Sequence, residues 1–108
     1  MDQTDVIFQL ILHGGNARSL AMEAIAQAKN KDLQGAQDAL NRAGEELSLA
    51  HQNQTALIQK EVTGEKTEIS MLLIHAQDHL MNAMTIKDLA TEFVELYGHI
   101  HAGKEAGV

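Results

Sequence analysis

Two histidines and an aspartate interrupt an otherwise apolar stretch of the chain, Leu72–Met84. The imidazoles belong to His75 and His79, and the carboxylate belongs to Asp78. An α-helix advances by about 100° per residue, so side chains three and four positions apart share one face. An imidazole with a pKa of about 6.5 is a nucleophile that can carry a phosphoryl group, and imidazoles also bind metal ions. The stretch therefore predicts either a chemical site or a set of paired polar groups on one helix face.

A zinc hydrolase is the first alternative, because the string HAQDH places His75 and His79 one turn apart, as two ligands could be. Peptidases with the H-x-x-E-H motif carry a glutamate base where this sequence has Asp78. No third ligand is evident, and a helical chain of 108 residues offers little substrate cleft. These points disfavour zinc hydrolysis. A phosphoryl acceptor and a paired interface cluster both stay open from the residues alone.

The composition indicates one all-α domain over residues 1–108. Proline and cysteine are absent, and Ala, Leu, Gln and Glu are abundant. Eight Lys and Arg against 15 Asp and Glu give a formal charge of -7, and one Tyr and two Phe offer no stacking platform, so nucleic acid is disfavoured as a partner. There is no basic leader and no apolar run near the roughly 20 residues of a membrane span. We expect a soluble, intracellular protein without membrane insertion.

Two breaks in the helical pattern predict three long helices. The first is Asn30–Asp32, where Asn30 can end one helix and Asp32 can cap the next. The second is Glu61–Thr67, with Gly64 and candidate threonine caps. Stripes at spacings of three and four run through the first two segments: Ile7, Leu10, Gly14, Ala17, Ala21, Ala24 and Ala28, then Ala36, Leu40, Ala43, Leu47, Ala50, Gln54 and Leu57. Such stripes are typical of bundle seams, so we predict an antiparallel three-helix bundle with a frayed tail at about 102–108.

The third segment carries two stripes instead of one. The first seam consists of Ile69, Leu73, Ala76, Leu80, Ala83, Ala90, Val94 and Tyr97, and is interrupted at Lys87. The second seam consists of Leu72, His75, His79, Asn82, Ile86, Leu89, Phe93, Leu96 and Ile100. Two other helices can cover one broad face, so a second sustained seam predicts a homo-oligomer. The polar cluster occupies the N-terminal half of this second seam and is expected at or beside a subunit contact.

The other histidines are not expected to belong to the site, with one exception. His13, His99 and His101 are expected to be partly exposed helix residues. His51 is less ordinary, because it lies with Gln54 on the seam side of the second helix.

The string His75–Met81, HAQDHLM, resembles the active-site motif of the enzyme IIA components in the lactose/cellobiose (N,N'-diacetylchitobiose) family of the bacterial sugar phosphotransferase system. Ala17–Ala21, ARSLA, is similar to the first-helix element of that family. Ala50–Ile58, AHQNQTALI, is similar to its second-helix element. The order and spacing of the three strings cover the chain from about residue 6 to residue 97.

The resemblance implies a phosphotransferase component that acts as a phosphocarrier. His75 is expected to accept a phosphoryl group on Nε2 from phospho-HPr, the phosphorylated carrier protein, and to pass it to a cysteine of the cognate enzyme IIB during uptake of a β-linked disaccharide. His79 is expected to assist, and Gln77 is a candidate supporting residue. The resemblance also implies a homotrimer in which Asp78 of each subunit binds a divalent cation, Mg²⁺, on the trimer axis.

Two other functions fit a helical bundle that presents a histidine. A histidine-phosphotransfer signalling domain usually follows its histidine with Lys-Gly, which His75-Ala76-Gln77 lacks. The second of these functions is that of a non-enzymatic trimeric adaptor. The chain also departs from its relatives at two places. Asn82 stands where they often have a small hydroxyl residue. Gly14-Gly15 softens the first helix, since Gly costs about 1 kcal/mol relative to Ala there.

Overall fold

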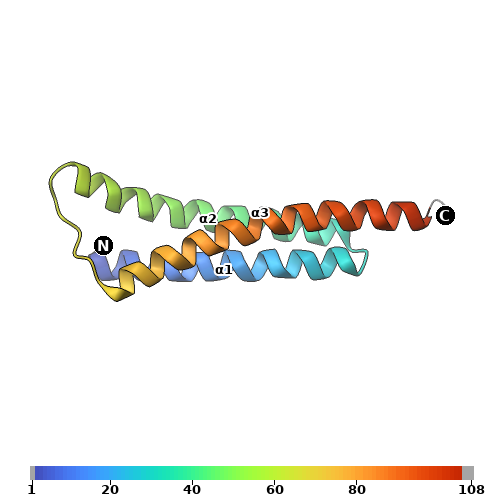
Figure 1. The fold of residues 1–108 in the computed structure, drawn as a ribbon, viewed down its shortest axis with the longest axis horizontal. Helices are drawn as coiled ribbons and strands as arrows, with labels where there is room; N and C mark the ends of the chain where they lie inside the picture. Colours follow the sequence, from blue (N-terminus) through green and yellow to red (C-terminus); the bar gives the residue numbers. More distant parts are fainter. Residues whose placement is uncertain (1, 106–108) are drawn as a thin grey trace.

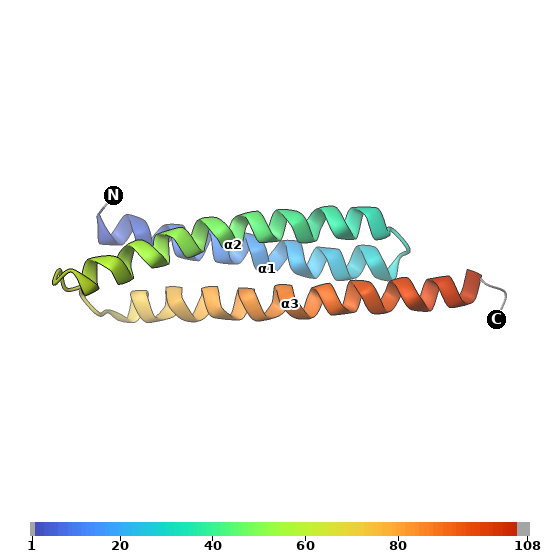
Figure 2. The same ribbon diagram turned by 90° about the horizontal axis from the view of Figure 1, so that it is seen from above.

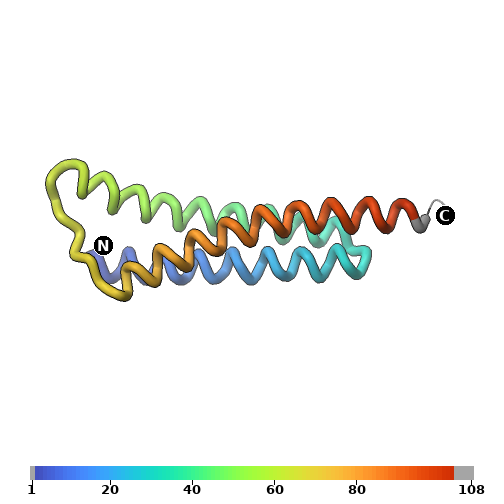
Figure 3. The backbone as a smooth tube through the Cα atoms, in the orientation of Figure 1, coloured from blue at the N-terminus to red at the C-terminus, as the bar shows by residue number. Residues whose placement is uncertain are grey.

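Three long helices account for most of residues 2–105, the part of the chain that the computed structural model describes (Figure 1). Helix α1 spans Gln3–Lys29, α2 spans Leu33–Val62 and α3 spans Met71–Glu105. Helix α2 runs antiparallel to α1 and α3, so α1 and α3 point the same way (Figure 2). Together they form a rod of 63 × 19 × 19 Å (Figure 3). The predicted all-α three-helix bundle is confirmed, and none of the described helices is long and apolar enough to cross a membrane.

The turn between α1 and α2 lies at the first predicted break. Helix α1 ends at Lys29, and Lys31 follows with φ 69°, the left-handed conformation that commonly ends helices. The Asp32 carboxylate then accepts a hydrogen bond from the Gly35 N–H (3.0 Å) and caps α2. Local signals alone are sufficient to specify this turn.

The link between α2 and α3 is longer than its pattern indicates. Helix α2 ends at Val62, and Gly64 turns the chain with φ 95°. The predicted threonine cap at the start of the third helix is wrong, because the loop continues past Thr67 and Ser70 caps the helix. The Ser70 Oγ accepts a hydrogen bond from the Leu73 N–H at 3.1 Å.

Small residues dominate the contacts between the helices. The buried members of the predicted stripes are Ile7, Leu10, Gly14, Ala17, Ala21, Ala24 and Ala28 in α1, Ala36, Leu40, Ala43, Ala50 and Leu57 in α2, and Leu73, Ala76, Leu80, Ala83, Ala90 and Val94 in α3. The largest fully buried side chains are Leu10 and Leu80. Alanine seams let helix axes approach closely but bury little apolar surface per residue. Ile69 was assigned to the first seam wrongly, because it precedes α3 and is exposed.

Most of the second seam of α3 is exposed, although His79 and Ile86 are half-buried. Its apolar members Leu89, Phe93, Leu96 and Ile100 are each at least 40% exposed. Helix α1 adds exposed large side chains of its own, Phe8, Leu12 and Met22. An alanine-rich interior with large apolar side chains outside is an arrangement typical of a subunit that associates. The C-terminal half of the second seam is therefore largely exposed in the single chain.

The C-terminal part of α3 is attached to the end of α1. His101 is 8% exposed, and its Nε2 donates a hydrogen bond to the Ala28 carbonyl oxygen at 2.8 Å. Its ring also stacks on Tyr97, with centroids 5.9 Å apart. The expected partial exposure of His101 is therefore wrong. Helix α3 continues to Glu105, through the first part of the expected frayed tail, and residues 106–108 lie outside the described part of the chain.

Candidate functional site

The predicted cluster lies on α3 near one end of the rod. His75 is exposed and stands one turn after the start of the helix. Its ring stacks on that of His79, with centroids 5.8 Å apart and planes inclined by 28°. His79 is half-buried, because its ring lies against α1. The two imidazoles that the sequence places on one face therefore form a stacked pair, His75 outside and His79 inside.

Asp78 presents its carboxylate on the same uncovered side of α3. It follows His75 by three residues and is exposed. Within residues 2–105, no group of three or more His, Cys, Asp or Glu side chains is arranged to hold a metal ion. One chain therefore offers a single carboxylate at this place. A metal centre built on Asp78 needs ligands from further copies of the chain.

Gln77 lies on the opposite side of α3 from His75, since two residues along a helix correspond to about 200°. The Gln54 Nε2 of α2 donates a hydrogen bond to the Gln77 Oε1 at 2.7 Å. This bond ties α3 to α2 at the level of the imidazole pair. Support from Gln77 can reach His75 only through the position of the helix.

Two glycines of α1 face His79. A Cβ atom at Gly14 would lie 3.3 Å from the His79 Cδ2 and 3.6 Å from the Leu80 Cα. A Cβ atom at Gly15 would lie 3.2 Å from the His79 Nε2. The His79 ring thus lies close against α1 at two positions that carry no side chain. From the sequence, the two glycines indicated only a locally less stable helix. The signal that could have revealed the contact is a glycine pair in mid-helix with no turn to explain it.

A shallow groove of about 250 Å³ continues from His79 between α1 and α3. It is lined by Arg18, His79, Asn82, Thr85 and Ile86. Arg18 is exposed. The groove thus places a guanidinium, an amide and a hydroxyl beside the inner imidazole, and these are donors that an anionic group can use.

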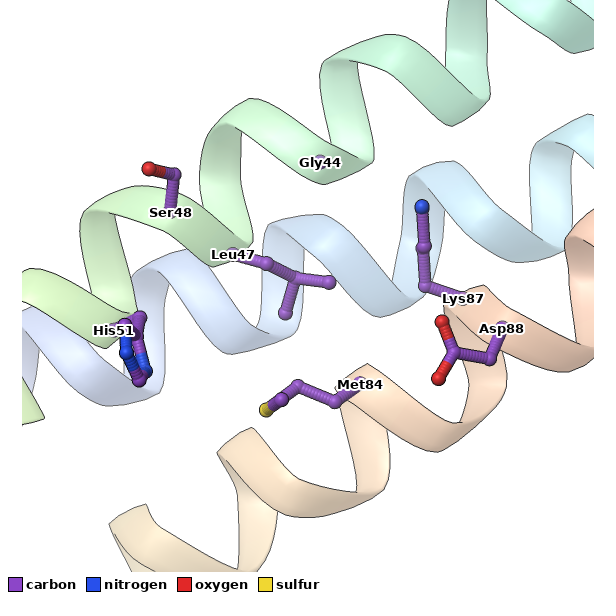
Figure 4. Close-up of a pocket in the computed structure, with 7 residues that line it drawn as sticks. All are labelled: Gly44, Leu47, Ser48, His51, Met84, Lys87 and Asp88. Atoms are coloured by element: carbon purple, nitrogen blue, oxygen red, sulfur yellow. The ribbon is translucent and has the colours of Figure 1, made fainter.

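A second groove, of about 350 Å³, opens between α2 and α3 (Figure 4). His51 and Leu47 reach it from α2, and Met84 and Lys87 reach it from α3. Lys87 is the residue that interrupts the first seam, and it is half-buried here. His75 lines neither groove. The structure therefore does not bring His51 into the imidazole pair.

His13 joins α1 to α2, away from the pair. Its Nδ1 faces the Glu46 carboxylate, and its Nε2 lies 3.0 Å from the Gln9 Oε1. Both ring nitrogens are engaged, and the ring is half-buried, as expected. His99 is exposed near Glu95. His13 therefore has no free ring nitrogen, and His99 lies 24 residues beyond His75 along α3.

The arrangement suits exchange with a macromolecule. His75 stands on a helix ridge, so a partner protein can approach its ring without entering a pocket. The half-buried imidazole of His79 stacks behind it and can donate a hydrogen bond to an oxygen of a group carried on the His75 ring. An exposed imidazole of this kind can accept a group from one protein and present it to another.

Comparison with known families gives a match over most of the chain. The family described as "PTS system, Lactose/Cellobiose specific IIA subunit" matches residues 5–98. The lichenan-specific phosphotransferase enzyme IIA component of Bacillus subtilis (strain 168) is 57% identical over 107 residues, 99% of this chain and 97% of the relative. The N,N'-diacetylchitobiose-specific EIIA component of Escherichia coli (strain K12) is 40% identical over 98 residues, 91% of this chain and 84% of the relative.

Solved structures give the same result. The cellobiose-specific enzyme IIA from Bacillus anthracis superposes with a TM-score of 0.90 at 55% identity, covering 94% of each chain. The IIA(Chitobiose)–HPr complex of the N,N'-diacetylchitobiose branch of the Escherichia coli phosphotransferase system contains a chain that superposes with a TM-score of 0.81 at 37% identity. That match covers 94% of this chain and 98% of the other.

Proposed function

The chain belongs to the lactose/cellobiose-specific IIA family of the sugar phosphotransferase system, and we propose that His75 is the residue through which it carries phosphoryl groups. The chain is thus a phosphotransferase component. The observation that carries the assignment is the exposure of His75 on a ridge, inside the HAQDHLM string, with His79 stacked behind it. A neutral imidazole attacks phosphorus with the lone pair of one nitrogen, here Nε2.

In this proposal the donor is phospho-HPr, and the acceptor is a cysteine of enzyme IIB in the cytoplasm. The bond from phosphorus to the donor breaks as the bond to the His75 Nε2 forms, and a bond to sulfur then replaces it. The similarity to the IIA chain of a IIA–HPr complex supports HPr as the donor. The names of the relatives, specific for lichenan, cellobiose and N,N'-diacetylchitobiose, support a β-linked sugar as the final acceptor.

Reconstitution tests this function. Incubation with phosphoenolpyruvate, enzyme I and HPr should place an acid-labile phosphate on the protein, and omission of HPr should prevent it. A trimeric adaptor would take no label. A signalling phosphotransfer domain would take its label from a phosphorylated response regulator and not from HPr.

His79 assists the transfer in this proposal, because its inner ring can donate a hydrogen bond to the phosphoryl oxygens on His75. We expect His79→Ala to slow transfer from phospho-HPr by roughly tenfold or more, while His75 remains the labelled residue. Rapid-quench measurement of the transfer rate, with mass spectrometry of the labelled peptide, checks both parts. An unchanged rate would limit His79 to packing against α1.

The subunits assemble as a homotrimer in this proposal. Three copies of α3 around a common axis would cover the exposed second seam, and burial of each large apolar side chain contributes roughly 1.5–3 kcal/mol. The number three is supported by the family resemblance. The alanine-rich interior of one chain and the uncovered seam support association as such.

Asp78 holds the cation of the trimer in this proposal. Three carboxylates that meet near an axis repel one another, and loss of water adds to the cost. The donor set fits a hard divalent ion such as Mg²⁺, because each carboxylate is exposed and supplies oxygen ligands. The ion would be structural, and the transfer chemistry stays with the histidine.

Replacement of Asp78 by Leu separates assembly from the metal. We expect Asp78→Leu to remain trimeric and to lose any dependence of assembly on divalent ions, because the repulsion is removed and the apolar seam is extended. Sedimentation with and without a chelator measures this, with the unmodified protein as the control. A variant that falls to monomers, or still needs the ion, would place Asp78 away from the axis.

A further inference from the structure

We propose that Gly15 is a positioning residue for His79, and that the absence of its side chain holds the inner imidazole in the place from which it serves His75. This inference rests on the proposed role of His79 in phosphoryl transfer. The inference assigns a function to a residue of α1 that carries no reactive group. Gly15 lies 64 positions before His79 in the sequence.

The two glycines that face His79 differ in what they make room for. At Gly14 an added Cβ would meet the Leu80 backbone, with its Cα at 3.6 Å and its N at 3.7 Å, as well as the His79 ring. A Cβ at Gly14 would therefore make ordinary contacts with the Leu80 backbone and one tight contact with the His79 ring. At Gly15 the only neighbour within 4 Å would be the His79 Nε2, at 3.2 Å. The space at Gly15 is thus reserved for one polar atom.

A helix-forming residue would otherwise suit position 15. Gly15 is within α1 and its φ is not positive, so neither a turn nor backbone strain requires glycine. Alanine would favour the helix by about 1 kcal/mol. The methyl group of alanine would also push the His79 ring away by a few tenths of an ångström. The ring would move because a side chain shifts more easily than the backbone of α1. Any such shift changes the placement of this ring relative to the His75 ring on which it stacks.

The displaced atom is the one that matters for the proposed chemistry. His79 lines the groove that also holds Arg18 and Asn82, where an anionic group finds donors. A methyl group at 3.2 Å would cover the His79 Nε2 on the α1 side and exclude a water or a donor there. Gly15→Ala should therefore stabilise the fold and impair transfer, a combination that a merely structural glycine does not give.

The experiment is a double-mutant cycle on the full-length protein. Gly15→Ala, His79→Ala and the double variant are compared with the unmodified protein for the rate of single-turnover transfer from phospho-HPr and for Tm. We expect Gly15→Ala to slow transfer roughly 3- to 10-fold. A misplacement of about 1 Å can slow a reaction about 100-fold, and the shift expected here is smaller. Its Tm should equal or exceed that of the unmodified protein. The double variant should transfer at the rate of His79→Ala, because no ring remains to be displaced.

Gly44→Ala is the matched control. Gly44 is half-buried in the middle of α2, and an added Cβ would meet nothing within 4 Å. It should gain helix stability and keep the full transfer rate. A second readout needs no transfer at all: the imidazole NMR signals of His79 should shift in Gly15→Ala and stay in place in Gly44→Ala.

The proposal fails if Gly15→Ala transfers at the full rate, if it slows the His79→Ala background by the same factor, or if the His79 signals do not move. The proposed function fails on a separate observation, the absence of phosphate on His75. In that event the NMR shift still decides whether Gly15 positions the ring.

Discussion

A His75→Gln variant should take no phosphate from phospho-HPr, the largest effect that any single substitution in this chain is expected to have. Glutamine keeps the polarity and approximate size of the side chain but has no nucleophilic nitrogen, since an amide lone pair is delocalised into its carbonyl. His75 is exposed, so the fold should change by no more than about 0.5 kcal/mol. Loss of label with unchanged helicity would locate the reaction at this ring.

His51→Gln is the control for this experiment. His51 is also an exposed histidine, and it lines the groove on the other side of α3. This variant should label as fully as the unmodified protein. If His75→Gln still acquires acid-labile phosphate on His51 or His79, the assignment of the acceptor is wrong.

Phe93→Glu should separate the subunits. Phe93 is 45% exposed in the second seam, 18 residues beyond His75. Loss of roughly 2 kcal/mol of apolar burial in each of three subunits, with a charge placed at the contact, should weaken trimer formation by roughly a thousandfold or more. Sedimentation at micromolar concentration should show a monomer whose helicity is preserved, because Phe93 does not belong to the buried core of the bundle.

Leu49→Glu provides the matched comparison. Leu49 is 44% exposed on α2 and lies outside the second seam, so the same charge should leave the association state unchanged. Persistence of the trimer in Phe93→Glu would move the interface to another face, and dissociation of both variants would show a general effect of added charge.

The parts of the fold that depend on neighbouring residues could be predicted from the sequence. The Asp32 cap and the alanine stripes are signals of this kind, and each lies where it was expected. The exposure of the second seam could also be predicted. The number of apolar faces on one helix can be counted from its sequence without knowing how the three helices are aligned. The HAQDHLM string carries the resemblance on which the proposed chemistry rests, and the structure adds the order of the two imidazoles, outer and inner.

The contacts between α1 and α3 could not be predicted, because they depend on the alignment of segments far apart in the chain. His101 meets the Ala28 carbonyl across 73 positions, and the same alignment brings His79 over Gly15. A helical pattern fixes which side of each helix faces inward but not its shift along the axis, and a shift of one turn would bring different residues together. The cap at Ser70 was missed because threonine and serine can both cap a helix, and both precede α3.

The rod has a consequence for how the protein can be handled. His75 lies near one end, and the exposed His99 lies 24 residues further along the same helix, about 36 Å away at 1.5 Å per residue. A dye or a surface tether attached at position 99 would stand clear of any small protein seated on the imidazole. The molecule can thus be anchored by its far end with its reactive ring facing the solution, and arrival and departure of each partner can be timed on a single immobilised sample.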